Sequence, residues 1–391
     1  MIEELKKLVA VAKGDVPADI VLRGGIVVDV LSGELVRDDV AIVANKIAGI
    51  GKYEGEVVVD ISGKYVLPGL LDSHAHIEPS RLSPQEYARE IIKHGTTGLI
   101  VNPHQISREC GLAGVEFMMH ELAKTPLNCA VMLPCELTAE EIEKNISRKE
   151  IFGLSVFSNY EEILSKIKLA HNVGKAVDGH ITGVGGLDLN AFFASGIRTN
   201  HECASVKEIQ STIKRGGYVH LGYGTKKNMP GLLSGVTQKN LRRFTFCTLE
   251  KSATEIMENG HINESLRIAV AMGIDPVDAV TMATLNTAEC YRMKRRGAIA
   301  PSYYADITVV DNLKNFKVRE VFINGKHVAT DGKCHYNKST IDFKRVVVEG
   351  ITDGELELPI AGLMSDLKAS DVVAKLNQPC EQEVVDADTE I

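Results

Sequence analysis

The chain is 391 residues long, and its 52 acidic against 44 basic side chains give a formal net charge of −8 with histidine neutral. This length can bury a core large enough for a barrel-sized domain together with a smaller one. The negative balance excludes the electrostatic footprint of proteins that bind nucleic acid or anionic membranes. No apolar run reaches the roughly 20 residues that span a bilayer, and the eight cysteines lack Cys-x-x-Cys spacing. We therefore expect reduced thiols in a cytoplasmic protein, with neither nucleic acid nor membrane as a partner.

Two sets of short apolar runs, one near each end of the chain, predict a small β domain. β-branched runs with turn signals between them favour strands. The runs cover residues 20–23, 25–28, 40–43, 57–59, 305–310 and 318–326. We expect a discontinuous β-sandwich domain made from residues 1–65 and 305–335, with the middle of the chain inserted in it. Residues 1–13 lack the apolar core of a signal peptide and are predicted to form a short amphipathic helix.

The stretch from Val66 to Glu78 contains a turn at Pro68-Gly69, an apolar strand and two histidines two positions apart. Side chains alternate between the two faces of a strand, so His74 and His76 are predicted to project to the same side. Two imidazoles side by side at the end of a strand make half of a metal site. A bare His-x-His pair is as often two surface histidines in a loop as half of a metal site. Other histidines along the chain are therefore needed to distinguish the two interpretations.

From residue 66 to residue 304, apolar strands alternate with helical stretches, which is typical of βα units around a parallel sheet. Helix starts are marked by capping boxes at Ser83–Glu86, with Pro84 in the first helical position, and at Ser205–Glu208. After the first strand, the predicted strands are 98–101, 130–133, 152–157, 175–178, 196–199, 218–221 and 243–247. Together they predict a complete (β/α)8 barrel, whose chemistry belongs at the C-terminal ends of its strands.

Histidines and acids recur where these predicted strands end. The residues at the strand ends are His74, His76, His104, Cys135, Val156, Asp178, His180, His201, Glu202, His220, Tyr223 and Glu250. Any one of these histidines is more often structural than a metal ligand. Four or more at equivalent positions around one end of a barrel indicate a metal site.

The same stretches carry a resemblance to a known family. Residues 68–76, Pro-Gly-Leu-Leu-Asp-Ser-His-Ala-His, resemble the first barrel strand of the metal-dependent amidohydrolase superfamily. Residues 76–80, His-Ile-Glu-Pro-Ser, and residues 102–106, Asn-Pro-His-Gln-Ile, narrow the resemblance to the adenine deaminase family. The likeness runs from about residue 18 to residue 333. It implies an α/β fold, a (β/α)8 amidohydrolase barrel, and the hydrolytic deamination of adenine to hypoxanthine and ammonia in purine salvage.

The resemblance also implies a cofactor and roles for site residues. By likeness to the family, His74 and His76 hold one divalent metal, while His180 and His201 help to hold a second. Mn²⁺ or Fe²⁺ is implied, and Zn²⁺ is compatible with the same ligand types. Such a metal lowers the pKa of a water from about 15.7 toward 7. His104 and Glu202 are candidates to position the purine or to shuttle protons, and a homo-oligomer is expected.

Several positions depart from the family pattern, and each departure removes a carboxylate or a charge. Val156 stands where a bridging glutamate is expected, and Leu249 stands where an aspartate is expected. Residues 222–224, Gly-Tyr-Gly, replace Arg-Glu-Gly, and residues 102–105, Asn-Pro-His-Gln, replace Asp-Pro-His-Glu. Neutral histidines alone leave the charge of a dication uncompensated, so we expect one tightly held metal at most.

Glu250 is the acid that remains at the end of strand eight. The alternation of Phe246, Thr248 and Glu250 predicts that Glu250 faces into the barrel, where it can act as the general base. The alternative is a solvated glutamate paired with the next residue, Lys251.

The departures leave three functions open. The first is an adenine deaminase, and the second is an amidohydrolase acting on a different cyclic amide or amidine. The third is a non-catalytic barrel that binds a purine or a protein. Residues 336–391 are expected to be a short remnant of the family's additional C-terminal domain, because residues 358–366 resemble the family's extreme C-terminal segment. Beyond residue 375 the acidic tail is predicted to be frayed.

Overall fold

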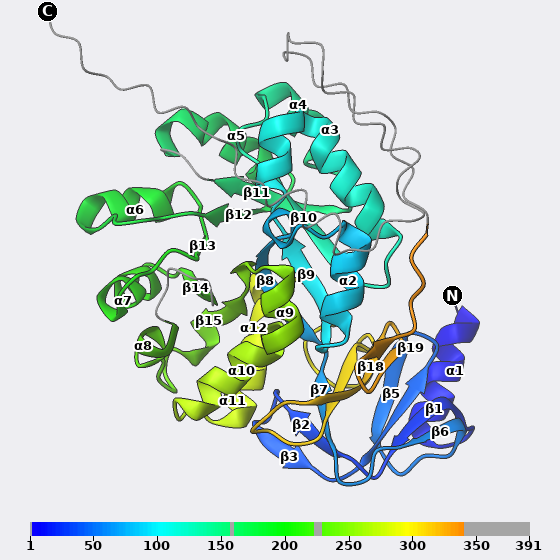
Figure 1. Cartoon of the computed structure of the whole chain (residues 1–391). Helices are drawn as coiled ribbons and strands as arrows, with labels where there is room; N and C mark the ends of the chain where they lie inside the picture. Colours follow the sequence, from blue (N-terminus) through cyan, green and yellow to red (C-terminus); the bar gives the residue numbers. More distant parts are fainter. Residues whose placement is uncertain (1, 157–159, 223–228, 340–391) are drawn as a thin grey trace, which may run out of the picture. The chain divides into compact units, whose positions relative to one another are not determined.

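The structure is a computed structural model that describes residues 2–156, 160–222 and 229–339, excepting the side chains of residues 160–162 (Figure 1). Residues 1–339 form one compact unit, and residues 340–391 lie outside the described residues. The expected C-terminal remnant and its tail fall almost entirely on that undescribed segment, so both remain predictions.

Strands from both ends of the chain build one sheet. Its seven strands follow the order β20 (Lys333–Cys334), β19 (Lys326–Thr330), β18 (Val318–Ile323), β17 (Ile307–Val310), β7 (Tyr65–Pro68), β2 (Ile26–Asp29) and β3 (Glu34–Val36). Strand β7 joins the two ends of the chain, because it pairs antiparallel with β17 and parallel with β2. This shared sheet supports a discontinuous β domain, although the boundaries of that domain remain a prediction.

A second sheet packs against the first. Its four strands follow the order β5 (Lys46–Gly51), β4 (Asp39–Val43), β1 (Ala18–Arg23) and β6 (Gly55–Asp60). Leu22 and Ile42 from this sheet share one buried apolar cluster with Val27 and Phe322 from the seven-stranded sheet. Burial of such side chains between two sheets is the arrangement of a sandwich. The predicted N-terminal helix is confirmed as α1 (Ile2–Lys13).

The middle of the chain forms the predicted barrel of parallel strands. They are β8 (Leu70–His76), β9 (Thr96–Val101), β10 (Asn128–Pro134), β11 (Ile151–Val156), β12 (Ala176–Gly179), β13 (Thr199–Asn200), β14 (Tyr218–Gly222), β15 (Phe244–Cys247) and β16 (Leu249–Glu250). One sheet runs β12-β11-β10-β9-β8-β16 and the other runs β13-β14-β15. The two sheets meet where β12 lies against β13 and where β15 lies against β8, which closes the ring. The (β/α)8 fold class is therefore confirmed.

Helices surround the barrel strands (Figure 1). Their bounds are α2 (Pro84–Ile92), α3 (His104–Ala123), α4 (Ala139–Asn145), α5 (Tyr160–Asn172), α6 (Gly186–Ala194), α7 (Val206–Lys214), α8 (Met229–Leu233), α9 (Ala253–Asn259), α10 (Ile262–Ala271), α11 (Pro276–Ala283) and α12 (Leu285–Cys290), with short 3-10 helices η1 (Glu78–Ser80) and η2 (Leu241–Arg243). No helix within the described residues is both long and apolar enough to cross a membrane.

The helix starts follow the predicted capping chemistry in part. At α2, Ser83 accepts a hydrogen bond from the Glu86 backbone amide, which is one half of the predicted capping box. At α7, Ser205 accepts from Glu208, but the Glu208 carboxylate accepts from the amide of residue 204 and not from the capping residue. Complete capping boxes occur instead at Thr138, before α4, and at Ser252, before α9. The same sequence pattern would have identified both.

Two strand predictions need correction. The sixth strand was expected at residues 196–199 but is the two-residue β13, because Gly196 has a φ of +98°, outside the range of a strand. The eighth strand was expected to continue from residue 243 through Glu250. It breaks into β15 and β16, because Leu249 has a φ of +56°. The alternation of side chains between the two strand faces, which predicts that Glu250 faces into the barrel, is therefore interrupted at Leu249.

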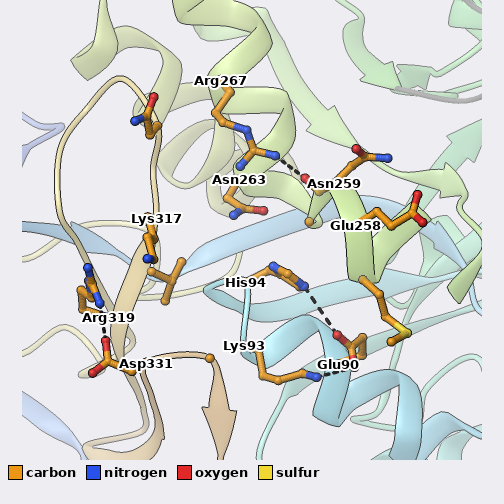
Figure 2. A pocket seen from close by; sticks show the side chains of 15 residues that line it. Glu90, Lys93, His94, Glu258, Asn259, Asn263, Arg267, Lys317, Arg319 and Asp331 are labelled. Carbon is orange, nitrogen blue, oxygen red and sulfur yellow. Dashed lines mark hydrogen bonds and ion pairs between the residues drawn. The ribbon is translucent and has the colours of Figure 1, made fainter. Parts of the chain in front are cut away.

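A cavity of about 600 Å³ lies among α2, α9, α10, β18 and the turn that follows β19 (Figure 2). Several charges on its wall are paired with one another. Glu90 contacts Lys93 at 2.5 Å and His94 at 3.6 Å, and Arg319 contacts Asp331 at 2.7 Å. None of the predicted site residues lines this cavity, so the candidate site is elsewhere.

Candidate functional site

The histidine pair at the end of β8 is buried. His76 is 6% exposed and its Nδ1 donates a hydrogen bond to the Asn102 carbonyl oxygen at 2.9 Å. Burial, reinforced by the neighbouring His74, lowers the pKa of His76 to about 3. His76 is therefore neutral at physiological pH, and its Nε2 carries a free electron pair. A neutral imidazole in this form is the commonest metal ligand in proteins.

His74 is held by two buried carboxylates. Its Nδ1 lies 2.7 Å from Asp178 Oδ2 on β12, and its backbone amide donates to Asp72 Oδ1 at 3.0 Å. Its Nε2 is buried and has no hydrogen-bond partner within the described part of the chain. A buried nitrogen without a partner costs free energy unless a ligand satisfies it. This atom is therefore a candidate to bind an ion.

His180 and His201 come from the ends of β12 and β13. His180 Nδ1 lies 3.2 Å from His201 Nε2. The Glu202 carboxylate lies 3.5 Å from His180 Nδ1 and 3.8 Å from His201 Nε2. Burial lowers the pKa of His201 well below its usual value, so this ring is neutral at physiological pH. Glu202 is only half-buried and can also face a bound molecule.

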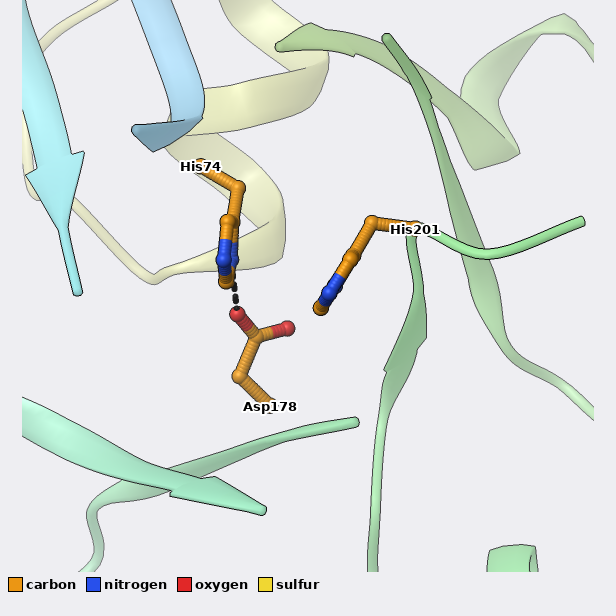
Figure 3. Close-up of side chains that lie close together, drawn as sticks. All are labelled: His74, Asp178 and His201. Carbon is orange, nitrogen blue, oxygen red and sulfur yellow. Dashed lines mark hydrogen bonds and ion pairs between the residues drawn. The ribbon is translucent and has the colours of Figure 1, made fainter. Parts of the chain in front are cut away.

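These side chains form two overlapping groups with the spacing of metal ligands. His74, Asp178 and His201 offer ligand atoms within 4.8 Å of one another, and so do His180, His201 and Glu202. The His74 and His201 rings stack with centroids 4.1 Å apart, and the Asp178 carboxylate points toward the pair (Figure 3). The His76 ring lies 5.0 Å from the His74 ring. Imidazole nitrogens and carboxylate oxygens together are a donor set that fits Zn²⁺, Mn²⁺ or Fe²⁺.

His104 lies beside this group at the start of α3. Its ring is 5.8 Å from the His76 ring, and its Nδ1 lies 3.3 Å from Glu136 Oε1. Glu136 follows β10 and was not singled out from the sequence. The pair resembles a carboxylate that orients an imidazole, the arrangement that makes a histidine effective in proton transfer.

Glu250 lies at the edge of the site. Its backbone is opposite His76 in the β8–β16 pair, yet its side chain is exposed and reaches Gln105 Nε2 at 3.5 Å. The alternative pairing with Lys251 is not what the structure contains, because Lys251 is buried against Glu264. The Glu250 carboxylate is thus accessible from solvent, and its role as a base remains a prediction.

Val156, at the end of β11, is 1% exposed and belongs to the main apolar core. Its Cα partner on β12 is Gly179, the residue between Asp178 and His180. The position that would carry a bridging carboxylate in the family pattern is therefore apolar. Tyr223, which the sequence also predicts at a strand end, lies outside the described residues.

Two buried aspartates support the site, and the sequence analysis missed both roles. Burial raises the pKa of the Asp178 carboxyl, but the neighbouring His74 and His220 outweigh it and hold that pKa below its usual value. Asp72 accepts hydrogen bonds from the Thr248 amide and hydroxyl, and burial raises its pKa to about 6. The available signal was an aspartate inside an otherwise apolar strand, since a buried acid needs partners.

His220, which the strand-end pattern also singled out, lies inside the barrel and is fully buried in this polar network. Its Nε2 lies 3.7 Å from Asp178 Oδ1 and 3.0 Å from the Tyr291 hydroxyl. The Tyr291 hydroxyl in turn donates to the Ser73 carbonyl oxygen at 2.9 Å. The network therefore ties strands β8, β12 and β14 together beneath the histidines.

Comparisons with known proteins agree with this architecture. The family model described as "Amidohydrolase family" matches residues 65–328. The chain is 41% identical over 342 residues to the adenine deaminase of Clostridium acetobutylicum, covering 82% of this chain and 60% of that protein. It is also 41% identical over 351 residues to adenine deaminase 2 of Desulfotalea psychrophila, covering 85% of this chain and 61% of that protein. The chain thus spans about 60% of the length of the curated relatives it matches.

Solved structures share the fold at lower identity. The structure of enamidase, described as a new member of the amidohydrolase superfamily, matches with a TM-score of 0.65 and 20% identity, over 80% of this chain and 96% of that one. The β-aspartyl dipeptidase of Fervidobacterium islandicum AW-1 matches with a TM-score of 0.63 and 17% identity, over 83% of this chain and 99% of that one. The match of the family model to most of the chain, over the segment that forms the barrel, shows that this protein belongs to the amidohydrolase family.

Proposed function

We propose that the protein is an adenine deaminase, which hydrolyses adenine to hypoxanthine and ammonia. The observation that carries the proposal is the convergence of His74, His76, His180 and His201 at one end of the barrel. Identity of about 40% to adenine deaminases over more than four fifths of the chain supports adenine as the substrate. The activity, its substrate and its place in purine salvage are proposed for this chain from its relatives and its site.

His74, His76, His180 and His201 would hold the metal, and the buried, unpartnered Nε2 of His74 fits that role. When bound, a divalent cation supplies Lewis acidity that lowers the pKa of water from about 15.7 toward 7. We propose Mn²⁺ or Fe²⁺ by family resemblance, with Zn²⁺ as an alternative of the same ligand preference. One ion per chain is proposed, because Val156 offers no carboxylate to bridge a second.

The remaining polar residues of the site would bind the purine and move protons. Glu250, whose carboxylate is exposed, would take a proton from the attacking water and deliver it to the leaving nitrogen. His104, oriented by Glu136, would stabilise charge on the ring or relay a proton. Glu202 would accept hydrogen bonds from the N–H groups of the base, because an ionised carboxylate is purely an acceptor.

A second candidate function is a barrel that binds a purine or a protein without catalysis. The apolar, buried Val156 at the end of β11 favours this candidate, since a dication held by neutral imidazoles alone is less well compensated. An amidohydrolase acting on a different cyclic amide or amidine is the third candidate. Changes at residues 222–224 and at Leu249 bear on that choice, because the sequence predicts these residues at strand ends, where a substrate ring would bind.

We also propose a cytoplasmic location and a homo-oligomeric state. The seven described cysteines are all free thiols, which supports a reducing compartment.

An ammonia-release assay tests the proposal directly. Protein loaded with Mn²⁺, Fe²⁺ or Zn²⁺ should convert adenine to equal amounts of hypoxanthine and ammonia, whereas the variant His201→Asn, purified in the same way, should not. Release from another cyclic amidine but not from adenine would favour the third candidate. Tight adenine binding without ammonia release would favour the non-catalytic candidate.

A further inference from the structure

We propose that Asp178 is a positioning residue of the metal site, which fixes the tautomer of His74 and supplies the negative charge that Val156 lacks. This deepens the proposed function and rests on it, since it concerns the same ion. It assigns a supporting role to a residue of β12 that the sequence places at a strand end, but to which neither the motifs nor the family likeness gives a role.

The Asp178 carboxylate is oriented through both of its oxygen atoms. Asp178 is fully buried, and its Oδ2 lies 2.7 Å from His74 Nδ1. Its Oδ1 accepts a hydrogen bond from the Thr199 hydroxyl and lies 3.7 Å from His220 Nε2. A carboxylate that is held on both sides cannot rotate to another partner without breaking buried hydrogen bonds, each of which is costly to lose.

This orientation decides which nitrogen of His74 can bind an ion. An ionised carboxylate only accepts hydrogen bonds, so Nδ1 of His74 carries the proton that it shares with Asp178. In the neutral ring, Nε2 then has the free electron pair. That nitrogen is buried and has no hydrogen-bond partner among the described residues. Metal-binding histidines commonly donate their other N–H to a carboxylate in this way.

The position of Asp178 also allows its carboxylate to compensate for the missing carboxylate at Val156, on strand four. Val156 pairs with Gly179 across the β11–β12 boundary, so Asp178 is one residue from the position beside Val156. A carboxylate oxygen of Asp178 lies within 4.8 Å of one ring nitrogen each of His74 and His201. At that distance and with complete burial, its attraction for a dication is little screened by solvent. The negative charge of the site therefore comes from strand five.

Asp72 provides a matched control. It is also fully buried, and it too contacts His74, but through the backbone amide at 3.0 Å and not through the ring. Its second oxygen is bonded to the Thr248 hydroxyl. Asp72→Asn removes a buried carboxylate that contacts the same residue, without freeing the His74 ring.

The first test measures Zn²⁺ affinity by competition with a chromogenic chelator. Asp178→Ala and Asp178→Asn should each raise the dissociation constant by about 10- to 100-fold, the usual cost of losing such a carboxylate. Asp72→Asn should change it less than threefold. Circular dichroism and thermal melting check that each variant is folded. Equal affinity in wild type and both Asp178 variants, or an equal loss in Asp72→Asn, would overturn the proposal.

The second test needs no Asp178 variant to fold. Long-range ¹H–¹⁵N spectra of histidine-labelled, metal-free wild type at pH 8 report the tautomer of each ring, and His74→Gln assigns the His74 signal. The proposal requires the proton on Nδ1 of His74, and a proton on Nε2 would overturn it. Neither test uses adenine. If the wild type releases no ammonia while both results are as expected, the proposed deaminase activity fails and the role of Asp178 stands.

Discussion

The two sides of the candidate site are built differently. On the β8–β12–β13 side, His74, Asp178 and His201 are buried and in contact with one another. On the β16 side, Glu250 is exposed, and its carboxylate lies 3.5 Å from Gln105 Nε2. Ligands that are fixed before an ion arrives favour tight binding, whereas a residue that exchanges protons with substrate must be within its reach. We infer that metal affinity depends on the first side and turnover on the second.

Replacing Glu250 should give the largest effect on turnover. It also distinguishes most clearly between the side of the site that binds the metal and the side that transfers protons. Glu250→Gln keeps the shape of the side chain and removes the base. Turnover should fall by about 100- to 10,000-fold, the usual contribution of a general acid–base group. Metal content should stay as in the wild type, because Glu250 is exposed and outside both ligand groups. Equal ammonia release by Glu250→Gln and wild type would remove Glu250 from the mechanism.

Glu136→Gln should have an intermediate effect on the same reaction. The Glu136 carboxylate lies 3.3 Å from His104 Nδ1, and a hydrogen bond to a charged group is worth about 1.5 kcal/mol or more. Turnover should therefore fall about tenfold, while Zn²⁺ affinity changes little. Steady-state kinetics on adenine with the metal-loaded protein check this. A tenfold weaker Zn²⁺ affinity with unchanged turnover would instead place His104 on the metal side.

The pH dependence of stability tests whether the histidines on the metal-binding side of the site are buried in the neutral form. The pKa of His76 is lowered to about 3 by burial, so the folded protein excludes a proton that the unfolded chain binds below about pH 6.5. The metal-free protein should therefore lose stability as pH falls from 6.5 toward 3, by up to about 1.4 kcal/mol per pH unit for such a histidine. Above pH 6.5 this contribution is fully present.

The pKa of Asp72 is shifted in the opposite direction, to about 6. Between pH 6 and 3.8, Asp72 therefore partly offsets the loss of stability that His76 causes as the pH falls. Its contribution is present below pH 3.8 and is lost as pH rises through 6. Urea unfolding at several pH values, with wild type and His76→Gln, measures the difference. A slope that is unchanged in His76→Gln would contradict the burial of a neutral ring at this position.

The smallest effect concerns the helix that follows Glu250. Ser252 caps α9 in a complete capping box, and Asp275 caps α11 away from the site. Replacing either cap by alanine should cost about 1 kcal/mol of stability, which corresponds to roughly 2 °C in Tm for a chain of this size. Ser252→Ala should also lower turnover a few-fold, because it loosens the chain after Glu250, whereas Asp275→Ala should not. Equal turnover in the two variants would show that Glu250 does not depend on α9.

The sequence was sufficient to predict the barrel and the grouping of the histidines. Alternation placed His74 and His76 on one face, and the regular βα order placed His180 and His201 at equivalent strand ends. The partnership of His74 with Asp178 could not be predicted, because the two residues are 104 positions apart and meet through the register of distant strands.

The strand-eight end shows a second limit. The alternation of side chains along a strand predicts that Glu250 faces into the barrel. Leu249 instead adopts a positive φ, which nothing in its residue type indicates. The contact of Glu136 with His104 likewise depends on the loop after β10, which brings the Glu136 carboxylate to 3.3 Å from His104 Nδ1. Strand interiors are governed by local patterning, whereas loop ends are set by tertiary contacts, and this site is built from both.

Metal content is the most direct measure of the claim that the buried histidine cluster is the metal site. Wild-type protein, loaded with Zn²⁺ or Mn²⁺ and dialysed, should retain one ion per chain by atomic emission spectroscopy. The double variant His74→Asn, His201→Asn should retain less than a tenth of that amount while keeping its far-UV circular dichroism spectrum. Two ions retained per wild-type chain, or the same content in wild type and double variant, would contradict the account.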